Sequence, residues 1–341
     1  MPYSEMLKVG LIGAGRIGQI HGGNLASHLP EVRLAAVADI DLAAARALGE
    51  RYDVPQVTSD YRELLSETEL AAVAICSSAD THAAIIQEAA AAGKHIFCEK
   101  PIDYDLKRVD QALAAVGTAE VKLQIGFNRR FDPNFRRVWE LLRQGRIGEP
   151  HLLRITSRDP ELPPLQYLKG SGGIFLDMTI HDFDMARYLI GSEVQELYVA
   201  GAVRIDPRYA ELGDLDTAMT TLKFEDGVIG TIDNSRQAVY GYDQRVEVFG
   251  SLGMVATDNE TPDRHTLSDQ NGIHGPLPLY FFLDRYQASY LEEMRSFVEC
   301  VRMDKTPEVT GADGRVSVVM GLAARKSYQE NRPVRLSEIE A

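Results

Sequence analysis

The chain has 341 residues, which fits about two domains, and 45% of them are hydrophobic, as in ordinary soluble globular proteins. Its net charge of −14 argues against nucleic-acid backbones and anionic membranes as partners. The three cysteines, Cys76, Cys98 and Cys300, are odd in number and widely spaced, which favours a reducing, cytoplasmic compartment over a disulfide framework.

Strand-length apolar runs alternate with helical stretches through residues 1–126. Residues 1–6 lack the pattern of a signal peptide, and no apolar run approaches the roughly 20 residues of a membrane helix. The expected strands are 8–12, 33–38, 71–76, 94–98 and 121–126, and the expected helices are 19–28, 42–52, 61–65, 83–92 and 106–116. This alternation implies right-handed crossovers and a parallel sheet.

The pattern changes near residue 150, where long strands follow one another. The expected strands are 151–158, 194–205, 217–224, 228–235 and 245–249, and the expected helices are 135–143, 178–189, 284–303 and 313–331. Consecutive strands without helices between them imply an antiparallel sheet. We therefore expect an α+β domain over residues 127–341 with a large open, mostly antiparallel sheet, whose last helix could return to the first domain.

A glycine-rich loop, Gly-Ala-Gly-Arg-Ile-Gly, follows the first expected strand directly and opens a helix. In this context Gly13 permits a tight turn and Gly15 lets the backbone approach a pyrophosphate. Gly18 lets the helix and the strand pack closely. A purely structural turn is the alternative. The context predicts a Rossmann dinucleotide-binding domain over residues 1–126.

Asp39, at the end of the second expected strand, indicates the cofactor. A carboxylate at this place accepts hydrogen bonds from the ribose hydroxyls of NAD and repels the 2′-phosphate of NADP. Asp41 adds a second negative charge, whereas Arg16 and Arg46 could pair with a phosphate. The balance favours NAD.

Lys100 lies just after the strand that ends at Cys98, within the run Glu99-Lys100-Pro101. Ligands of open parallel sheets bind outside the carboxyl ends of the strands, so this ammonium group would face a ligand there. A solvated loop lysine is the alternative.

Asp177 and His181 are four residues apart, which places them on one face if the segment is helical. A carboxylate beside an imidazole suits a general base that removes a hydroxyl proton. An N-cap with a neighbouring polar residue is the alternative. A metal site with Asp182 and Asp184 is not expected, because no second histidine stands at ligand spacing.

These motifs together resemble the Gfo/Idh/MocA oxidoreductase family over residues 8–333. Residues 126–132 and 172–184 are also similar to the inositol 2-dehydrogenases of that family. The resemblance implies that Lys100 hydrogen-bonds the reacting oxygen, that His181 is the proton acceptor, and that Asp177 is its partner and touches substrate. It also implies a cis Lys100–Pro101 bond and a homotetramer assembled through the open face of the second sheet.

The resemblance further implies two binding sets. The substrate would contact Arg130, Asp159, Asp177, His181 and either Tyr240 or Tyr242, with Tyr240 taken first. The cofactor NAD would contact Gly13, Gly15, Arg16, Ile17, Gly18, Asp39, Ser77, Ser78, His82, Glu99 and Lys100, with no metal.

The activity implied is the NAD-dependent oxidation of a cyclic polyol, with myo-inositol to 2-keto-myo-inositol first, in inositol catabolism. The same chemistry on scyllo-inositol or an aldose is the alternative. A non-catalytic NAD-binding regulator is a further alternative, but such a relative would be expected to lose Lys100 or His181, and this chain keeps both. An interaction module built on the open sheet leaves the combination of Asp39, Lys100 and His181 unexplained.

Overall fold

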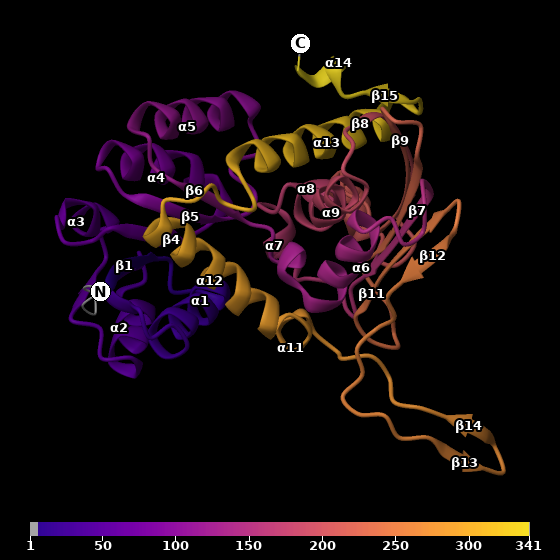
Figure 1. The fold of residues 1–341 in the computed structure, drawn as a ribbon, viewed down its shortest axis with the longest axis horizontal. Coiled ribbons are helices and arrows are strands. Elements are labelled where there is room, and N and C mark those ends of the chain that lie inside the picture. The colour runs from indigo at the N-terminus through magenta and orange to yellow at the C-terminus, as the bar shows by residue number, and fades with distance from the viewer. Residues whose placement is uncertain (1–5, 341) are drawn as a thin grey trace. The chain divides into compact units, whose positions relative to one another are not determined.

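The computed structural model describes residues 6–340, so the expectation about a signal peptide concerns residues that are largely outside the described part. The chain forms two compact units, which are Met1–Phe131 with Ala288–Val318, and Asp132–Gln287 with Val319–Ala341 (Figure 1). Among the described residues, no helix combines the length and the apolar character needed to cross a membrane.

The first unit is built on a six-stranded parallel sheet with the strand order β3-β2-β1-β4-β5-β6. This order reverses between β1 and β4, as in dinucleotide-binding folds, which confirms the predicted Rossmann domain. The strands are β1 (Leu7–Ile12), β2 (Val32–Ala38), β3 (Gln56–Thr58), β4 (Ala72–Ile75), β5 (His95–Glu99) and β6 (Leu123–Gly126).

Helices cover both faces of this sheet. Figure 1 shows α4 and α5 on one side and α1, α2 and α12 on the other. The helices are α1 (Arg16–Ser27), α2 (Leu42–Arg51), α3 (Tyr61–Ser66), α4 (Ala79–Ala91), α5 (Leu106–Ala119) and α12 (Gln287–Met303), with a 3-10 turn at Asn128–Phe131. Because both faces are covered, β4 is buried at every position and consists of apolar residues throughout.

The division of the chain differs from the expected one in residues 288–318. The expected first domain ended at residue 126, whereas the first unit reaches Phe131 and also contains nearly all of α12 and the start of α13 (Gly311–Glu330). The physical reason is that Met294, Phe297 and Val298 of α12 are buried in the core formed by β1, β2, α1 and α2.

The second unit is built on a seven-stranded sheet with the order β12-β11-β7-β10-β9-β8-β15. Only β7 and β10 pair in parallel, so the sheet is mostly antiparallel, as predicted. The strands are β7 (Pro150–Arg158), β8 (Val194–Ala202), β9 (Thr217–Phe224), β10 (Ile229–Ser235), β11 (Asp243–Gly250), β12 (Gly253–Ala256) and β15 (Val334–Arg335).

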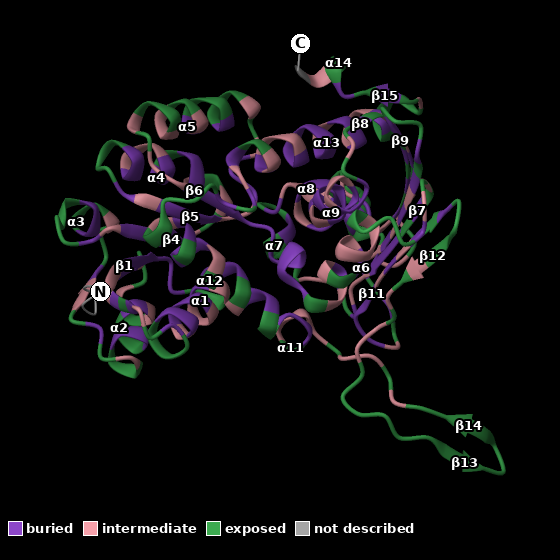
Figure 2. Cartoon of the chain, in the orientation of Figure 1, coloured by how far each residue is buried: buried purple, intermediate pink, exposed green. Residues whose placement is uncertain are grey.

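The remaining elements of the second unit are helices and one projecting hairpin. The helices are α6 (Pro133–Arg143), α7 (Leu165–Leu168), α8 (Gly173–Asp177), α9 (Ile180–Ile190), α10 (Arg208–Glu211), α11 (Phe282–Arg285), most of α13, and α14 (Ser337–Glu340). The hairpin of β13 (Leu267–Asp269) and β14 (Gly272–His274) extends away from the seven-stranded sheet, and its residues are exposed (Figure 2).

Candidate functional site

The loop after β1 has the geometry that its glycines predict. Gly13 adopts φ +99°, and a Cβ there would lie 2.5 Å from the carbonyl group of Cys76. A Cβ on Gly18 would lie 1.9 Å from the carbonyl oxygen of Gly13. Gly15 is the N-cap of α1, and a Cβ there would meet nothing within 4 Å. The N-terminus of α1 is therefore open to an anion such as the pyrophosphate of NAD.

Replacing Gly18 by alanine is expected to lower the free energy of unfolding by about 1–3 kcal/mol, the usual cost of overpacking. The loop must move to remove the contact with Gly13, so NAD binding should weaken as well. Thermal melting and a fluorescence titration with NAD measure the two effects. Gly117→Ala in α5 is the control, because a Cβ there meets nothing within 4 Å. Equal melting temperatures and affinities for the two variants would contradict the prediction.

Asp39 lies at the carboxyl end of β2 and contacts the glycine loop directly. Its Oδ2 accepts a hydrogen bond from the backbone N–H of Ala14 at 2.6 Å, and its Oδ1 accepts one from Asp41 at 2.8 Å. A carboxylate has about four acceptor positions, so capacity remains for ribose hydroxyls. Arg16 is exposed and Ile17 is half-buried on the first turn of α1. The residues present fit a bound NAD.

Ser77, Ser78 and His82 follow β4, beside Gly13. His82 is buried, and its Nδ1 lies 2.8 Å from the carbonyl oxygen of Pro101 and its Nε2 3.0 Å from that of Ser77. Burial lowers the pKa of His82 below its usual value. His82 thus ties the loop after β4 to the turn after β5. Contact of these three side chains with the cofactor remains a prediction.

Glu99 and Lys100 lie at the carboxyl end of β5, where the parallel sheet would present them to a ligand. The Lys100–Pro101 peptide bond is cis, as the family resemblance implied. The side chain of Lys100 is half-buried. Glu99 contacts His21 of α1, with 2.8 Å between the carboxylate Oε1 and the imidazole Nε2. The motif is therefore anchored to the glycine-loop helix.

Asp177 and His181 do not share one continuous helix, so the condition under which they would lie on one helical face is not met. α8 ends at Asp177 and α9 begins at Ile180. The backbone N–H groups of Met178 and Thr179 both bond to the carbonyl of Ile174, at 3.0 and 2.9 Å. At the break, the Thr179 hydroxyl donates to Asn234 on β10 at 2.8 Å and to the carbonyl oxygen of Ile174 at 3.2 Å.

The first turn of α9, which carries His181, is held on the seven-stranded sheet. The side-chain amide of Asn234 donates to Asp182 at 2.8 Å, and Asn234 and Asp182 are buried. Asp182 therefore has a structural partner of its own, which accounts for a carboxylate beside His181 without a metal. His181 is half-buried, and the turn of α9 that carries it is fixed by the hydrogen bond between Asn234 and Asp182.

Asp177 is organised by two residues that sequence reasoning missed. The Tyr167 hydroxyl donates to its Oδ1 at 2.7 Å, and Arg236 donates to its Oδ2 at 3.0 Å. Arg236 is only 1% exposed and also lies 4.0 Å from a carboxylate oxygen of Asp214. Burial lowers the pKa of Arg236, but the nearby carboxylates, first Asp177 and then Asp159, raise it more, to above its usual value. Arg236 is therefore a buried cation close to carboxylates that are distant from it in sequence, those of Asp177, Asp159 and Asp214.

Replacing Arg236 by methionine is expected to lower the free energy of unfolding by about 3 kcal/mol, because it leaves carboxylates without their buried cation. Urea unfolding measures the change. Arg208→Met is the control, since the Arg208 side chain is 61% exposed and its ion pair with Asp206 is screened by solvent, so the loss of stability should be much smaller. Equal losses in the two variants would contradict the assignment of Arg236 as the organising cation.

Arg130 and Tyr240, both expected to bind substrate, have protein partners. Arg130 is buried in the first unit, where it pairs with Asp313 at 2.9 Å. Tyr240 donates to Asp243 at 2.6 Å and accepts from Arg158 at 3.0 Å. These contacts explain both residues structurally, and their contacts with substrate remain predictions. Tyr242, the alternative to Tyr240, is buried.

The last long helix, α13, begins at Gly311, two residues before the start expected from the sequence. Asp313 in its first turn accepts hydrogen bonds from the backbone N–H of Thr310 at 2.9 Å and from its hydroxyl at 2.8 Å. The backbone N–H of Asp313 donates to the Thr310 hydroxyl at 3.3 Å, which completes a reciprocal capping box.

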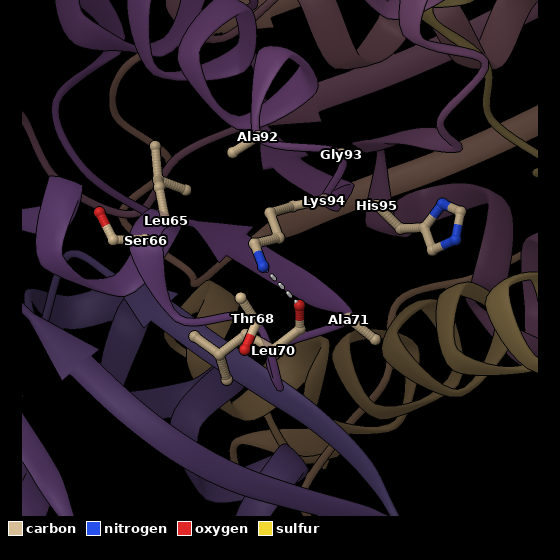
Figure 3. A pocket seen from close by; sticks show the side chains of 9 residues that line it. All are labelled: Leu65, Ser66, Thr68, Leu70, Ala71, Ala92, Gly93, Lys94 and His95. Carbon is tan, nitrogen blue, oxygen red and sulfur yellow. Dashed lines mark hydrogen bonds between the residues drawn. The ribbon is translucent and has the colours of Figure 1, made fainter.

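A surface pocket of about 580 Å³ lies at the other end of the first sheet (Figure 3). Its lining includes Ala71 and His95, at the amino ends of β4 and β5. Lys94 in this pocket donates to the carbonyl oxygens of Glu67 at 2.5 Å and Leu70 at 2.8 Å, so its ammonium group supports the chain after α3. The pocket is opposite to the glycine-loop end of the strands and holds no predicted site residue.

Known proteins resemble this chain over nearly its whole length. Residues 7–127 match the model of the oxidoreductase family with an NAD-binding Rossmann fold, and residues 135–256 match the GFO/IDH/MocA C-terminal domain. The myo-inositol 2-dehydrogenase of Thermotoga maritima is 47% identical, over 98% of this chain and 99% of that protein.

Two solved structures are similar to the computed one. A probable dehydrogenase from Thermotoga maritima has a TM-score of 0.96 and 47% identity, over 98% of this chain and all of that chain. A scyllo-inositol dehydrogenase from Lactobacillus casei, with bound NAD(H) and scyllo-inositol, has a TM-score of 0.92 and 30% identity, over 98% of this chain and all of that chain. The chain belongs to the Gfo/Idh/MocA family of NAD-binding oxidoreductases.

Proposed function

We propose that this oxidoreductase oxidises myo-inositol to 2-keto-myo-inositol with NAD as the cofactor. The observation that carries the proposal is the 47% identity, end to end, with a protein named myo-inositol 2-dehydrogenase. The polar cluster of Asp177, Asp159, Arg236 and Tyr167 in the second unit supports a substrate with many hydroxyl groups.

The first unit supplies the cofactor side of the reaction. The open N-terminus of α1 at Gly15 binds the pyrophosphate, and Asp39 accepts hydrogen bonds from the ribose. NAD, when bound, accepts the hydride. Ser77, Ser78, His82 and Glu99 line the nicotinamide half. Lys100 donates a hydrogen bond to the reacting oxygen and stabilises the negative charge that develops on it.

The second unit supplies the proton acceptor and the substrate contacts. His181 takes the hydroxyl proton, and Asp177 accepts a hydrogen bond from a neighbouring hydroxyl group. Asp159, Arg130 and Tyr240 complete the set of substrate contacts. Because Tyr167 and Arg236 hold Asp177 already, its carboxylate is fixed before a substrate arrives.

The second candidate is the same oxidation of scyllo-inositol. It is favoured by the 30% identical Lactobacillus casei enzyme, whose structure holds scyllo-inositol. Lys100, His181 and Asp177 serve both substrates equally, since the chemistry is shared.

We further propose a cytoplasmic homotetramer that acts in inositol catabolism. Exposed apolar side chains support an interface on one face of the second sheet. Ile229, Leu152, Phe249 and Met254 are partners in adjacent strands, from β10 through β7 and β11 to β12. Such a continuous apolar row favours burial against another subunit. Light scattering on the purified protein measures the assembly.

Spectrophotometric detection of NADH tests the function. The purified protein is mixed with NAD or NADP and, separately, with myo-inositol, scyllo-inositol, glucose, xylose or lactate. NADH formation with myo-inositol and NAD is the expected result. A higher kcat/KM on scyllo-inositol or an aldose would change the assignment of the preferred substrate. Binding of NAD without its reduction by any polyol would favour the regulator alternative.

A further inference from the structure

A buried histidine and two carboxyl groups meet behind the end of β5. His21 on α1 places its Nε2 2.8 Å from Oε1 of Glu99 and 3.7 Å from Oε1 of Glu293 on α12. The side chains of His21 and Glu293 are 0% exposed, and that of Glu99 is 12% exposed. Within residues 6–340, His21 is the one basic side chain at ion-pair distance from either carboxyl group. The three groups share a single potential cation.

Glu293 lacks the partners that a buried carboxylate requires. Both of its carboxyl oxygens are buried without a hydrogen-bond partner among the described residues. An ionised carboxylate in that position loses its hydration and gains no hydrogen bond in return, whereas a carboxylic acid is far less costly to bury. Burial, and then the charge of Glu99, raise the pKa of Glu293 well above its usual value.

Two thiols near the cluster supply no compensating positive charge. Burial raises the pKa of Cys76 and of Cys98 well above the usual value for a thiol, so both are neutral. The rings of Phe97 and Tyr290 pack edge-on against the imidazole of His21. Neutralisation by a proton is therefore the simplest way to bury the second carboxyl group.

Glu99 is the member of the cluster that suits a negative charge. It lies at hydrogen-bond distance from His21, and it is the only one of the three that reaches solvent. Its carboxyl group also lies close to the backbone of Gly126 at the end of β6, where an added Cβ would come within 3.0 Å of its Oε2. Lys100 follows it directly in the chain.

We propose that Glu293 is held as a neutral carboxylic acid, and that His21 fixes Glu99 as the single carboxylate of the cluster at the end of β5. His21 and Glu293 are then positioning residues for the turn that carries Lys100. The consequence for Lys100 rests on the proposed function, whereas the protonation state of Glu293 does not.

Infrared difference spectroscopy tests the protonation state directly. The wild-type protein at neutral pH should show the carbonyl stretch of a protonated carboxylic acid, and Glu293→Gln should lack it while keeping its melting temperature. Glu292→Gln is the matched control, since this neighbour on α12 is exposed and paired with Arg295. Loss of the band in the control, or no band that depends on Glu293, would overturn the proposal.

Two substitutions of His21 test the positioning role. His21→Leu removes the N–H donor and should lower turnover about tenfold or more, as expected for losing a hydrogen bond to a charged group. His21→Gln retains a donor of similar reach and should recover most of that turnover. Equal losses in folded, equally stable variants would overturn the positioning role. If the wild-type protein reduces no NAD with any polyol, the proposed function fails while the infrared result still stands.

A divalent cation is the other species that could neutralise the cluster, because the three side chains offer one ligand atom each within 4.8 Å of one another. Elemental analysis of the purified protein decides this point. The expected result is no stoichiometric metal in the wild type. A metal present at one per chain and lost in Glu293→Gln would overturn the proposal.

Discussion

Turnover is expected to fall at least about 100-fold when Lys100 is replaced by methionine, because removing one preorganised donor to a developing oxyanion costs this much. Methionine keeps much of the length and apolar stem of lysine and removes only the ammonium group. The affinity for NAD should change little, because the proposed contacts with the pyrophosphate and the ribose come from Gly15 and Asp39, which follow other strands. Steady-state NADH formation and a fluorescence titration with NAD measure the two quantities.

The control for this experiment is Lys107→Met, which removes an exposed ammonium group from the first turn of α5. It should leave turnover, NAD affinity and melting temperature at their wild-type values. A folded Lys100→Met variant with near-wild-type turnover would show that Lys100 takes no part in the reaction. A variant that loses NAD binding as strongly as turnover would make Lys100 a cofactor ligand alone.

The fold was largely predictable because its signals are local. β4 is an apolar run buried on both faces, and the glycine loop directly joins β1 to α1. The strands β3, β12, β13, β14 and β15 escaped prediction, since two to four residues are too few to show a period of two. β15 exists because Val334 and Arg335 pair with Leu197 and Glu196, a partnership across more than a hundred residues.

The residues of the candidate site could be chosen from the sequence, but the hydrogen bonds and ion pairs between them could not. Spacing suggested that Asp177 and His181 share a helical face, whereas Thr179 bonds to Asn234 and the helix breaks between them. Arg236 follows β10 as an ordinary arginine, and its ion pair with Asp177 spans 59 positions. No local pattern reveals a cation whose partners are brought to it only by the tertiary fold.

Replacing His181 by asparagine is expected to lower turnover about 10²–10⁴-fold at neutral pH, the usual contribution of a general base. The surrounding frame should remain, because Asn234 holds the start of α9 and Arg236 and Tyr167 hold Asp177. The KM for the polyol should therefore change less than turnover.

The pH dependence separates loss of the base from loss of the fold in this variant. With the imidazole absent, hydroxide becomes the available proton acceptor, so the deficit relative to wild type should shrink as the pH rises. A pH series of NADH formation measures this trend, and His28→Asn, at the exposed end of α1, is the matched control. A deficit that is constant across the series, with an unchanged melting temperature, would show that His181 positions the substrate and that another group takes the proton.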